Sequence, residues 1–177
     1  MSMKLKTACL MICVLAAAGA AMAQSTGANP AAERTESINS TVPLPRVVLD
    51  LLIEPFKDDE HYRDSVIGKS DEELNKYFAA VVVHLSRPDQ VDYVIEGRGP
   101  FAGADSARLW IVRSSGSQFK VVLNETASFF ELLNIRTSGY KDIRSVWIVS
   151  GQRRTRLFHF TGTEYKRAEE KWSGDLQ

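Results

Sequence analysis

The residues that could do chemistry in this sequence are few and lie far apart. The three histidines, His61, His84 and His159, show no metal-ligand spacing such as H-x-x-x-H. No G-x-S-x-G motif surrounds a serine, and the serines beside Gly116 are explained by turn chemistry. Gly97-Arg98-Gly99-Pro100 contains G-x-G, but its proline favours a turn over a phosphate-binding loop. The sequence therefore predicts a protein that is not an enzyme and that uses no cofactor.

Two groups of carboxylates could hold a cation. Asp58, Asp59 and Glu60 are consecutive, and Asp89 lies just before Asp92. Neighbouring carboxylates could also serve as an acid and base pair. However, calcium requires six or more oxygen ligands, and a short acidic run is typical of a solvated loop. We therefore expect no metal site, with cation binding at either group as the alternative.

Basic and aromatic residues in the second half of the chain are the strongest indication of function. Residues 50–100 carry 12 acidic and 6 basic side chains, whereas residues 101–168 carry 5 acidic and 11 basic ones. Arginine and aromatic side chains dominate the energetics of protein interfaces. The alternative is that an acidic helical part packs on a basic sheet, so that the charges cancel internally. We predict a binding site formed by Tyr140, Arg144, Trp147, Arg153, Arg154, Arg156 and His159.

The first residues have the pattern of a secretory signal peptide. Lys4 and Lys6 precede an apolar run, and Ala21-Met22-Ala23 provides the small-x-small cleavage pattern. We expect cleavage after Ala23, no transmembrane segment in the remaining chain, and a periplasmic or secreted location. Both cysteines and all four methionines fall within residues 1–23, so the remaining chain contains no sulfur. Disulfides and thiolate metal sites are then impossible, and stability must come from a packed core.

The spacing of apolar side chains predicts the elements that position these residues. Residues 24–45 are rich in Ser, Ala and Pro and are expected to form a flexible leader. Helical spacing over residues 46–87 favours two helices, the second with a capping box at Ser70 to Glu73 and an apolar stripe to Leu85. From residue 90 to 168 the period becomes two and glycines separate the runs, which indicates strands joined by turns. Residues 169–177 are expected to be a polar tail.

These elements define the expected fold. The composition, with 44% hydrophobic and 25% charged residues, is that of a globular chain and excludes a disordered or an integral membrane protein. The fold class is α+β, with two N-terminal helices packed on a six- or seven-stranded antiparallel sheet that forms a meander of hairpins. Residues 46–168 would form a single domain of this kind.

The predicted sheet contains a possible internal repeat. One unit runs from Asp92 to Lys120 and the other from Asp142 to Lys166, and each ends in Gly-x-x-aromatic-Lys. The alternative is that any two hairpins share such a pattern. The segments from Ser138 to Ile143 and from Phe158 to Lys166 resemble a C-terminal module of small exported bacterial proteins of unknown function. Residues 88–97 are distantly similar to the strand of FG-GAP/VCBS-type repeats, a resemblance that implies a calcium-binding acidic loop, although only Asp89 precedes Asp92 here.

These features together indicate an exported, non-enzymatic binding module, possible roles being an inhibitor, an immunity-type protein or an envelope-associated protein. Its partner would be a protein of the cell envelope. Nucleic acid is not expected as a ligand, because the chain is neutral overall and exported. The alternatives are a binder of anionic cell-wall polymer and a small hydrolase whose catalytic residues meet only in the folded protein.

Overall fold

The computed structural model describes residues 33–34, 41–116 and 118–174. The predicted signal peptide and most of the predicted leader lie outside the described residues. Within the described part there are two antiparallel sheets, one of four strands in the order β2-β3-β4-β5 and one of five in the order β1-β6-β7-β8-β9. The described helices are too short and too polar to span a bilayer. The protein is therefore mainly antiparallel sheet with a small helical part, which confirms the β-rich α+β class in its coarse form.

The prediction of two N-terminal helices is wrong, because the helices lie between strand β1 (Glu33–Arg34) and strand β2 (Phe78–Val83) rather than before all the strands. The helices are α1 (Arg46–Ile53), η1 (Glu54–Phe56), α2 (Arg63–Val66) and α3 (Asp71–Asn75), and a further 3₁₀ turn, η2, covers Gly99–Phe101. The first sheet contains β2 (Phe78–Val83), β3 (Asp92–Gly97), β4 (Ala107–Ser115) and β5 (Gln118–Ala127). The second contains β1 (Glu33–Arg34), β6 (Phe129–Thr137), β7 (Tyr140–Val149), β8 (Gln152–Phe160) and β9 (Tyr165–Ser173).

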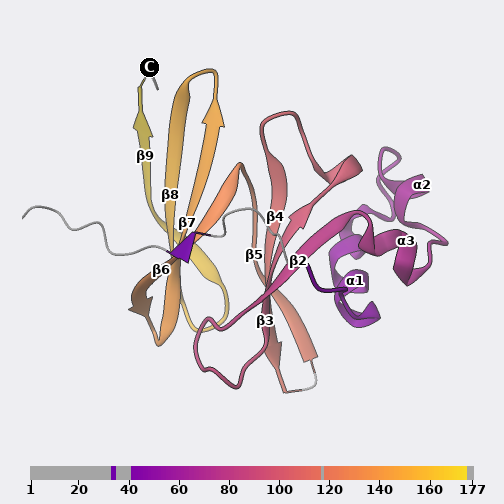
Figure 1. Ribbon diagram of the computed structural model, residues 1–177, viewed down its shortest axis with the longest axis horizontal. Coiled ribbons are helices and arrows are strands. Elements are labelled where there is room, and N and C mark those ends of the chain that lie inside the picture. Colours follow the sequence, from indigo (N-terminus) through magenta and orange to yellow (C-terminus); the bar gives the residue numbers. More distant parts are fainter. Residues whose placement is uncertain (1–32, 35–40, 117, 175–177) are drawn as a thin grey trace, which may run out of the picture.

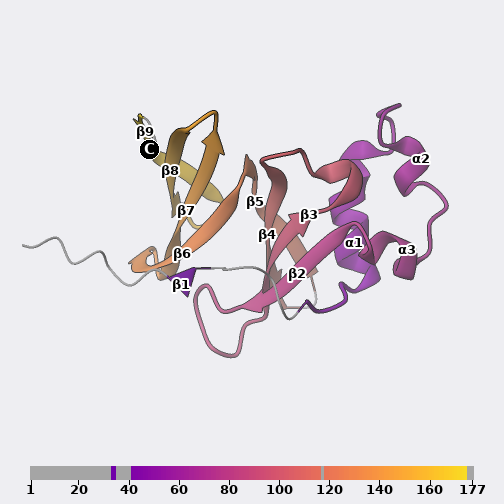
Figure 2. The ribbon, with the colours of Figure 1, turned by 45° about the horizontal axis from the view of Figure 1, so that its top comes forward.

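The four-stranded sheet is the middle layer of the molecule. Figures 1 and 2 show the helices at one end beside β2–β5, and strands β6–β9 at the other end. Alternate residues of β4 therefore enter two cores, since neighbouring side chains of a strand point to opposite faces. Trp110 and Val112 pack with the helices, whereas Leu109 and Ile111 pack with the second sheet. Both faces of this sheet are buried, which explains its long apolar strands.

The prediction of one sheet of six or seven strands is wrong. The chain leaves β5 at Ala127 and enters β6 at Phe129, so a single residue, Ser128, separates a strand of the first sheet from a strand of the second. The Ser128 hydroxyl donates to the carbonyl oxygen of Asp105 at 2.8 Å and accepts from the backbone N–H of Ile148 at 3.0 Å. Both sheets are thereby held to the residue at which the chain crosses between them, and the period-two pattern of the sequence carries no sign of this bend.

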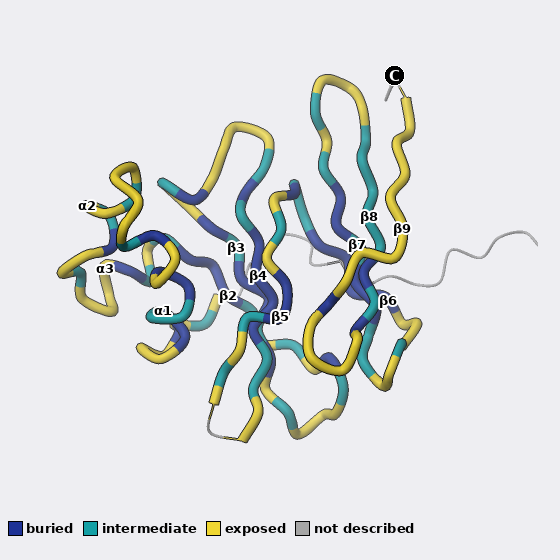
Figure 3. The backbone as a smooth tube through the Cα atoms, turned by 180° about the vertical axis from the view of Figure 1, so that it is seen from behind, coloured by how far each residue is buried: buried dark blue, intermediate teal, exposed yellow. Residues whose placement is uncertain are grey.

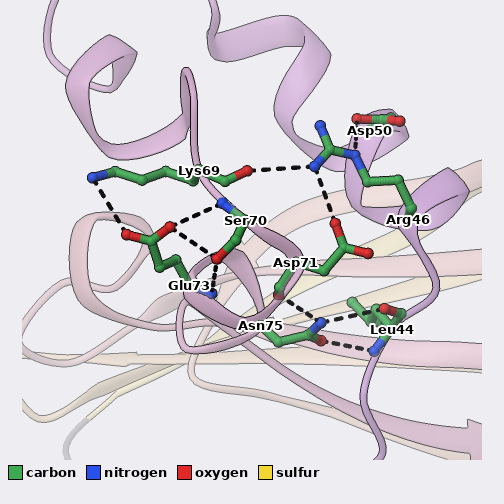
Figure 4. Close-up of polar contacts among 8 residues, drawn as sticks. All are labelled: Leu44, Arg46, Asp50, Lys69, Ser70, Asp71, Glu73 and Asn75. Atoms are coloured by element: carbon green, nitrogen blue, oxygen red, sulfur yellow. Dashed lines mark hydrogen bonds and ion pairs between the residues drawn. The ribbon is translucent and has the colours of Figure 1, made fainter.

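The predicted second helix is also wrong beyond its first turns. Its capping box is present, because the Ser70 N–H donates to Glu73 at 2.9 Å and the Glu73 N–H donates to the Ser70 hydroxyl at 3.3 Å (Figure 4). The hydrogen bond from the Ser70 backbone lowers the pKa of Glu73. However, α3 ends at Asn75, and the apolar run from Phe78 forms β2 instead. A continuous apolar run suits a strand buried on both faces, and its β-branched valines favour a strand over a helix. The sheet thus begins at Phe78 rather than at residue 90.

The end of the predicted leader and the predicted tail are both part of the fold. Leu44 is buried, and its backbone N–H donates to the Asn75 side chain at 2.7 Å (Figure 4). Residues 33–34 pair with β6 as an edge strand. At the other end, β9 continues to Ser173, well into the stretch expected to be a polar tail. Each unit of the possible repeat forms a three-stranded meander, β3-β4-β5 in one sheet and β7-β8-β9 in the other; their origin by duplication stays a prediction.

A buried carboxylate, Asp92, organises the first strand of the first meander. Its side chain is fully buried and accepts hydrogen bonds from the backbone N–H groups of Leu85 and Ser114, both at 3.2 Å, and from the Gln90 amide at 3.1 Å. Burial raises the pKa of Asp92, while these hydrogen bonds and Arg113 oppose the rise. Asp92 therefore satisfies the backbone where the loop after β2 meets the ends of β3 and β4.

Replacing Asp92 with alanine should lower the free energy of unfolding by about 2–4 kcal/mol, because two buried backbone N–H groups lose their acceptor. Urea-induced unfolding followed by tryptophan fluorescence measures this change. The matched control is Asp89→Ala, at an exposed position three residues earlier; it should change stability by less than about 0.5 kcal/mol. Equal stability of the two variants would contradict the role of Asp92.

The raised pKa of Asp92 also predicts a pH dependence. Between the ordinary carboxyl value and the raised native value, the folded protein holds a proton that the unfolded chain has lost, so this group stabilises the fold less as pH rises. The difference in unfolding free energy between the wild type and Asp92→Asn, which cannot titrate, should decrease as pH rises from the ordinary carboxyl value of about 4 through the raised native value. A difference that stays constant or increases over this range would show that the sign is wrong.

Candidate functional site

The candidate site lies on the three strands β7, β8 and β9. Figure 1 shows the β7–β8 hairpin and the C-terminal end of β9 standing together at one end of the second sheet, and Figure 3 shows that these strands change from buried to exposed toward that end. Ile143 is fully buried where the two sheets meet, whereas Ile148, five residues later on β7, is 36% exposed. The same strands thus contribute to the core and present a free surface.

The strand register divides the predicted arginine cluster between two faces. Trp147, Arg154 and Trp172 lie opposite one another across β7, β8 and β9. Arg153 is the next residue to Arg154, so its side chain points to the other face, where Arg144 also lies two rows away. The structure therefore does not bring the predicted site residues together as one patch.

The first face presents an arginine between two tryptophans. The Arg154 guanidinium lies 3.9 Å from the centre of the Trp147 ring and 5.5 Å from that of Trp172. Trp172 is 54% exposed, and Arg154 forms no ion pair with the carboxylates that the structure describes. Partial burial lowers the pKa of Arg154. The stacked guanidinium is thus held rigidly while its N–H groups remain available to an acceptor.

Arg156, one row nearer the core, has a different role. Its guanidinium donates to both carboxylate oxygens of Glu125 on β5, at 2.8 and 3.0 Å, and to Glu170 on β9. The Arg156 side chain is only 18% exposed; burial alone would lower its pKa, but the hydrogen bonds that it donates to these two carboxylates, and their charges, raise it. Arg156 therefore joins the two sheets and is neutralised by carboxylates on β5 and β9, not by the acidic helical part that the alternative interpretation of the charge asymmetry expected.

The second face holds the other two arginines around one carboxylate. Arg144 Nη1 donates to Glu131 at 2.8 Å, and Arg153 Nη2 lies 3.9 Å from the other oxygen of Glu131. The Glu131 side chain, on β6, is only 5% exposed. A single buried carboxylate thus orients two guanidinium groups.

His159 and Tyr140 lie at the opposite end of the strands from the tryptophans. His159 Nδ1 lies 3.0 Å from the buried Asp142 carboxylate and 3.2 Å from the Thr137 hydroxyl. Since a carboxylate only accepts hydrogen bonds, Nδ1 is the nitrogen that donates to Asp142, and Nε2 lies on the other side of the ring. This is how an aspartate orients a histidine for acid–base chemistry, but the Thr137 hydroxyl contacts the same nitrogen as Asp142 and is not placed as a nucleophile at Nε2.

Tyr140 contributes to the packing between the sheets. Its ring centre lies 4.1 Å from that of Phe160, and the Arg113 guanidinium of β4 lies 4.7 Å above the Tyr140 ring. Buried Tyr165 next to Phe160 donates its hydroxyl hydrogen to the Lys141 carbonyl, and burial raises the Tyr165 pKa. Tyr140 is therefore part of a structural cluster rather than of the exposed tryptophan face.

The remaining residues that the sequence singled out lie elsewhere. His61 and His84 are both exposed, and His84 follows β2 and contacts the Gln90 carbonyl at 2.8 Å. Within the part of the chain that the structure describes, no three side chains of His, Cys, Asp or Glu gather as metal ligands. In the acidic segment, the Asp59 carboxylate accepts from the His61 backbone N–H at 2.9 Å, which is a turn contact.

Sequence reasoning missed Trp172 and the carboxylates that partner the arginines. The sequence predicts a polar tail around Trp172, because residues 166–171 show no alternation of apolar and polar types. A bulge between β8 and β9 near Ala168 shifts the register, and every residue of β9 after Tyr165 is exposed. The only signal was the pair of large aromatic residues, Tyr165 and Trp172, near the two ends of the strand.

Comparison of the chain with protein-family models, curated proteins and solved structures found no match. The resemblance to exported bacterial modules and to FG-GAP/VCBS-type repeats therefore stays a prediction.

The different surroundings of two nearby arginines predict different effects on stability. Arg156→Ala should lower the free energy of unfolding by about 1–3 kcal/mol, because Glu125 loses a charged hydrogen-bond donor where the sheets meet. Arg154→Ala removes mainly a stacking contact and should cost less than about 1 kcal/mol. Thermal and urea unfolding of both variants measure the difference. The assignment is contradicted if Arg154→Ala proves the more damaging change.

Proposed function

We propose that this protein is an exported, non-enzymatic binding module that captures an envelope protein through the tryptophan face of β7–β9. We define the tryptophan face as Trp147, Arg154 and Trp172 together with the exposed rims of their strands. The observation that carries the proposal is the stacking of Arg154 between Trp147 and Trp172 on an open sheet surface. Tryptophan and arginine are the side chains most enriched in the energetic centres of protein interfaces.

The chemistry of this face specifies its partner. An arginine already stacked on aromatic rings loses little side-chain freedom on binding, so it can donate to a carboxylate at low entropic cost. The indole of Trp172 offers apolar area that a partner can cover. We therefore infer a partner surface in which an Asp or Glu side chain is surrounded by apolar residues, as an inhibitor-type or immunity-type pairing would provide.

The structure also shows which substitutions can test this proposal. Arg156 cannot be used, because it joins the sheets and its loss would weaken the fold itself. Arg154 pairs with no carboxylate in the described part of the chain, and the Trp172 indole donates only to the exposed residue Glu170, at 3.3 Å, so changing either leaves no buried carboxylate without its partner.

Arg154→Glu and Trp172→Ala should each reduce capture of the partner at least about tenfold, the loss expected for an interface residue worth more than 1.4 kcal/mol. The measurement is quantitative affinity capture from an envelope extract with tagged wild-type and variant proteins. Lys166→Glu, an exposed change on the same strand, and Ile67→Ala, an exposed apolar change at the helical end, are the matched controls and should capture normally. Unaltered capture by both test variants, with unfolding temperatures equal to the wild type, would remove this face as the binding site.

A further inference from the structure

The face of β7–β9 opposite the tryptophans contains a shallow cavity of about 410 Å³. Three cross-strand pairs of β8 and β9 form most of it, and β7 adds Arg144. Its lining consists of Arg144, Arg153, Thr155, Leu157, Glu169, Lys171 and Ser173. A volume of this size matches a small organic molecule rather than an ion alone.

Arg144 and Arg153 are held in place at this cavity, but their N–H donors outnumber the acceptors that Glu131 provides. Glu131, buried on β6 directly opposite Arg144, fixes Arg144 at 2.8 Å and lies 3.9 Å from Arg153, so one carboxylate serves two guanidinium groups. Each guanidinium has five N–H donors, and the Nε of Arg153 is buried without a hydrogen-bond partner in the described part of the chain. The Arg144 and Arg153 side chains are still 26% and 35% exposed. The pair therefore presents surplus positive charge and surplus donors to the cavity.

The rest of the lining suits the body of such a ligand. Leu157 gives an apolar surface between the arginines and the third strand, and Thr155 and Ser173 place hydroxyl groups in the lining. The Ser173 hydroxyl donates to the Arg153 carbonyl at 3.4 Å, which ties β9 to β8 at this end. On the rim, Lys171 pairs with Glu169 at 2.7 Å, so both signs of charge are present there. A lining with a cationic end, hydroxyl groups and a small apolar surface suits a polar ring compound that carries an anionic group.

We propose that this cavity binds a sugar-sized molecule that carries a carboxylate or phosphate group, with the oxyanion between Arg144 and Arg153. Guanidinium groups match the oxygens of both anions in a two-pronged geometry, and their prior orientation by Glu131 lowers the cost of binding. The site is separate from the tryptophan face, because neighbouring residues of β8 point to opposite sides of the sheet. The protein thus has a second, independent binding surface.

Isothermal titration of the purified protein with glucuronate, glucose 6-phosphate, inorganic phosphate and glucose tests the proposal. Glucuronate or glucose 6-phosphate should bind, glucose should not, and inorganic phosphate should bind more weakly than the sugar acid or sugar phosphate. The tighter of the first two identifies the preferred oxyanion. Binding should weaken as sodium chloride is raised, because the contact is ionic. Equal binding of glucose and glucuronate, or no binding of either charged sugar, would overturn the proposal.

Variants locate the site. Arg153→Gln should weaken binding about tenfold, as expected for loss of one charged hydrogen-bond donor, while the Arg144–Glu131 pair is kept. Arg153→Lys retains the charge and loses the planar guanidinium, so its affinity should lie between those of the wild type and Arg153→Gln. This variant replaces Arg153→Gln as the test if Arg153→Gln does not fold. Lys166→Gln, outside the cavity on β9, is the control and should bind like the wild type. Wild-type affinity in both Arg153 variants would show that the ligand binds elsewhere.

Discussion

The packing of the five-stranded sheet on the four-stranded sheet determines what the rest of the molecule can present. Only Ser128 separates β5 of the first sheet from β6 of the second, so the two layers must meet close to that residue. Apolar side chains such as Ile111, Phe130 and Ile143 fill the space between them. Arg136 adds a polar tie, donating to the carbonyls of Leu85 and Ser86 at 2.8 and 3.1 Å and thereby holding the loop after β2 against the second sheet.

One consequence is a gradient of environment along β7, β8 and β9. Close to the junction the strands contribute Ile143 and Phe158 to the core, and one row farther out Arg156 and Glu125 still connect the layers. Beyond that row the first sheet no longer covers them, and the large side chain of Trp172 remains exposed. An exposed tryptophan costs solubility in a monomer, and large apolar groups left on a surface often mark interaction sites. The stacking of Arg154 shields part of this aromatic surface.

The sequence predicts the elements that depend on neighbouring residues, but not those that depend on contacts between distant parts of the chain. The Ser70 capping box and the strands after residue 90 were predictable, because hydrogen bonding within one turn and alternation within one strand are encoded by neighbouring residues. The segment from Phe78 to Leu85 was not, since an apolar stripe at helical spacing and an apolar strand buried on both faces share the same letters. Only the presence of the helices on one side and the second sheet on the other makes such a strand stable. The bend at Ser128 and the bulge that precedes Trp172 depend on tertiary contacts in the same way.

The arrangement of the candidate site also could not be predicted from neighbouring residues alone. Arg153, Arg154 and Arg156 are close in sequence and indicate one basic patch, yet strand alternation sends Arg153 to one face and the other two to the opposite face. Burial then separates Arg154 from Arg156, because only Arg156 reaches the carboxylate of Glu125 on the neighbouring sheet. Three arginines within four residues thus line a shallow cavity, stack on a tryptophan and join the two sheets, respectively. The β7–β8 hairpin is exposed on both faces at its tip and packs on the first sheet at its base. The three arginines can therefore act independently, because a contact on either face of the tip need not disturb the core.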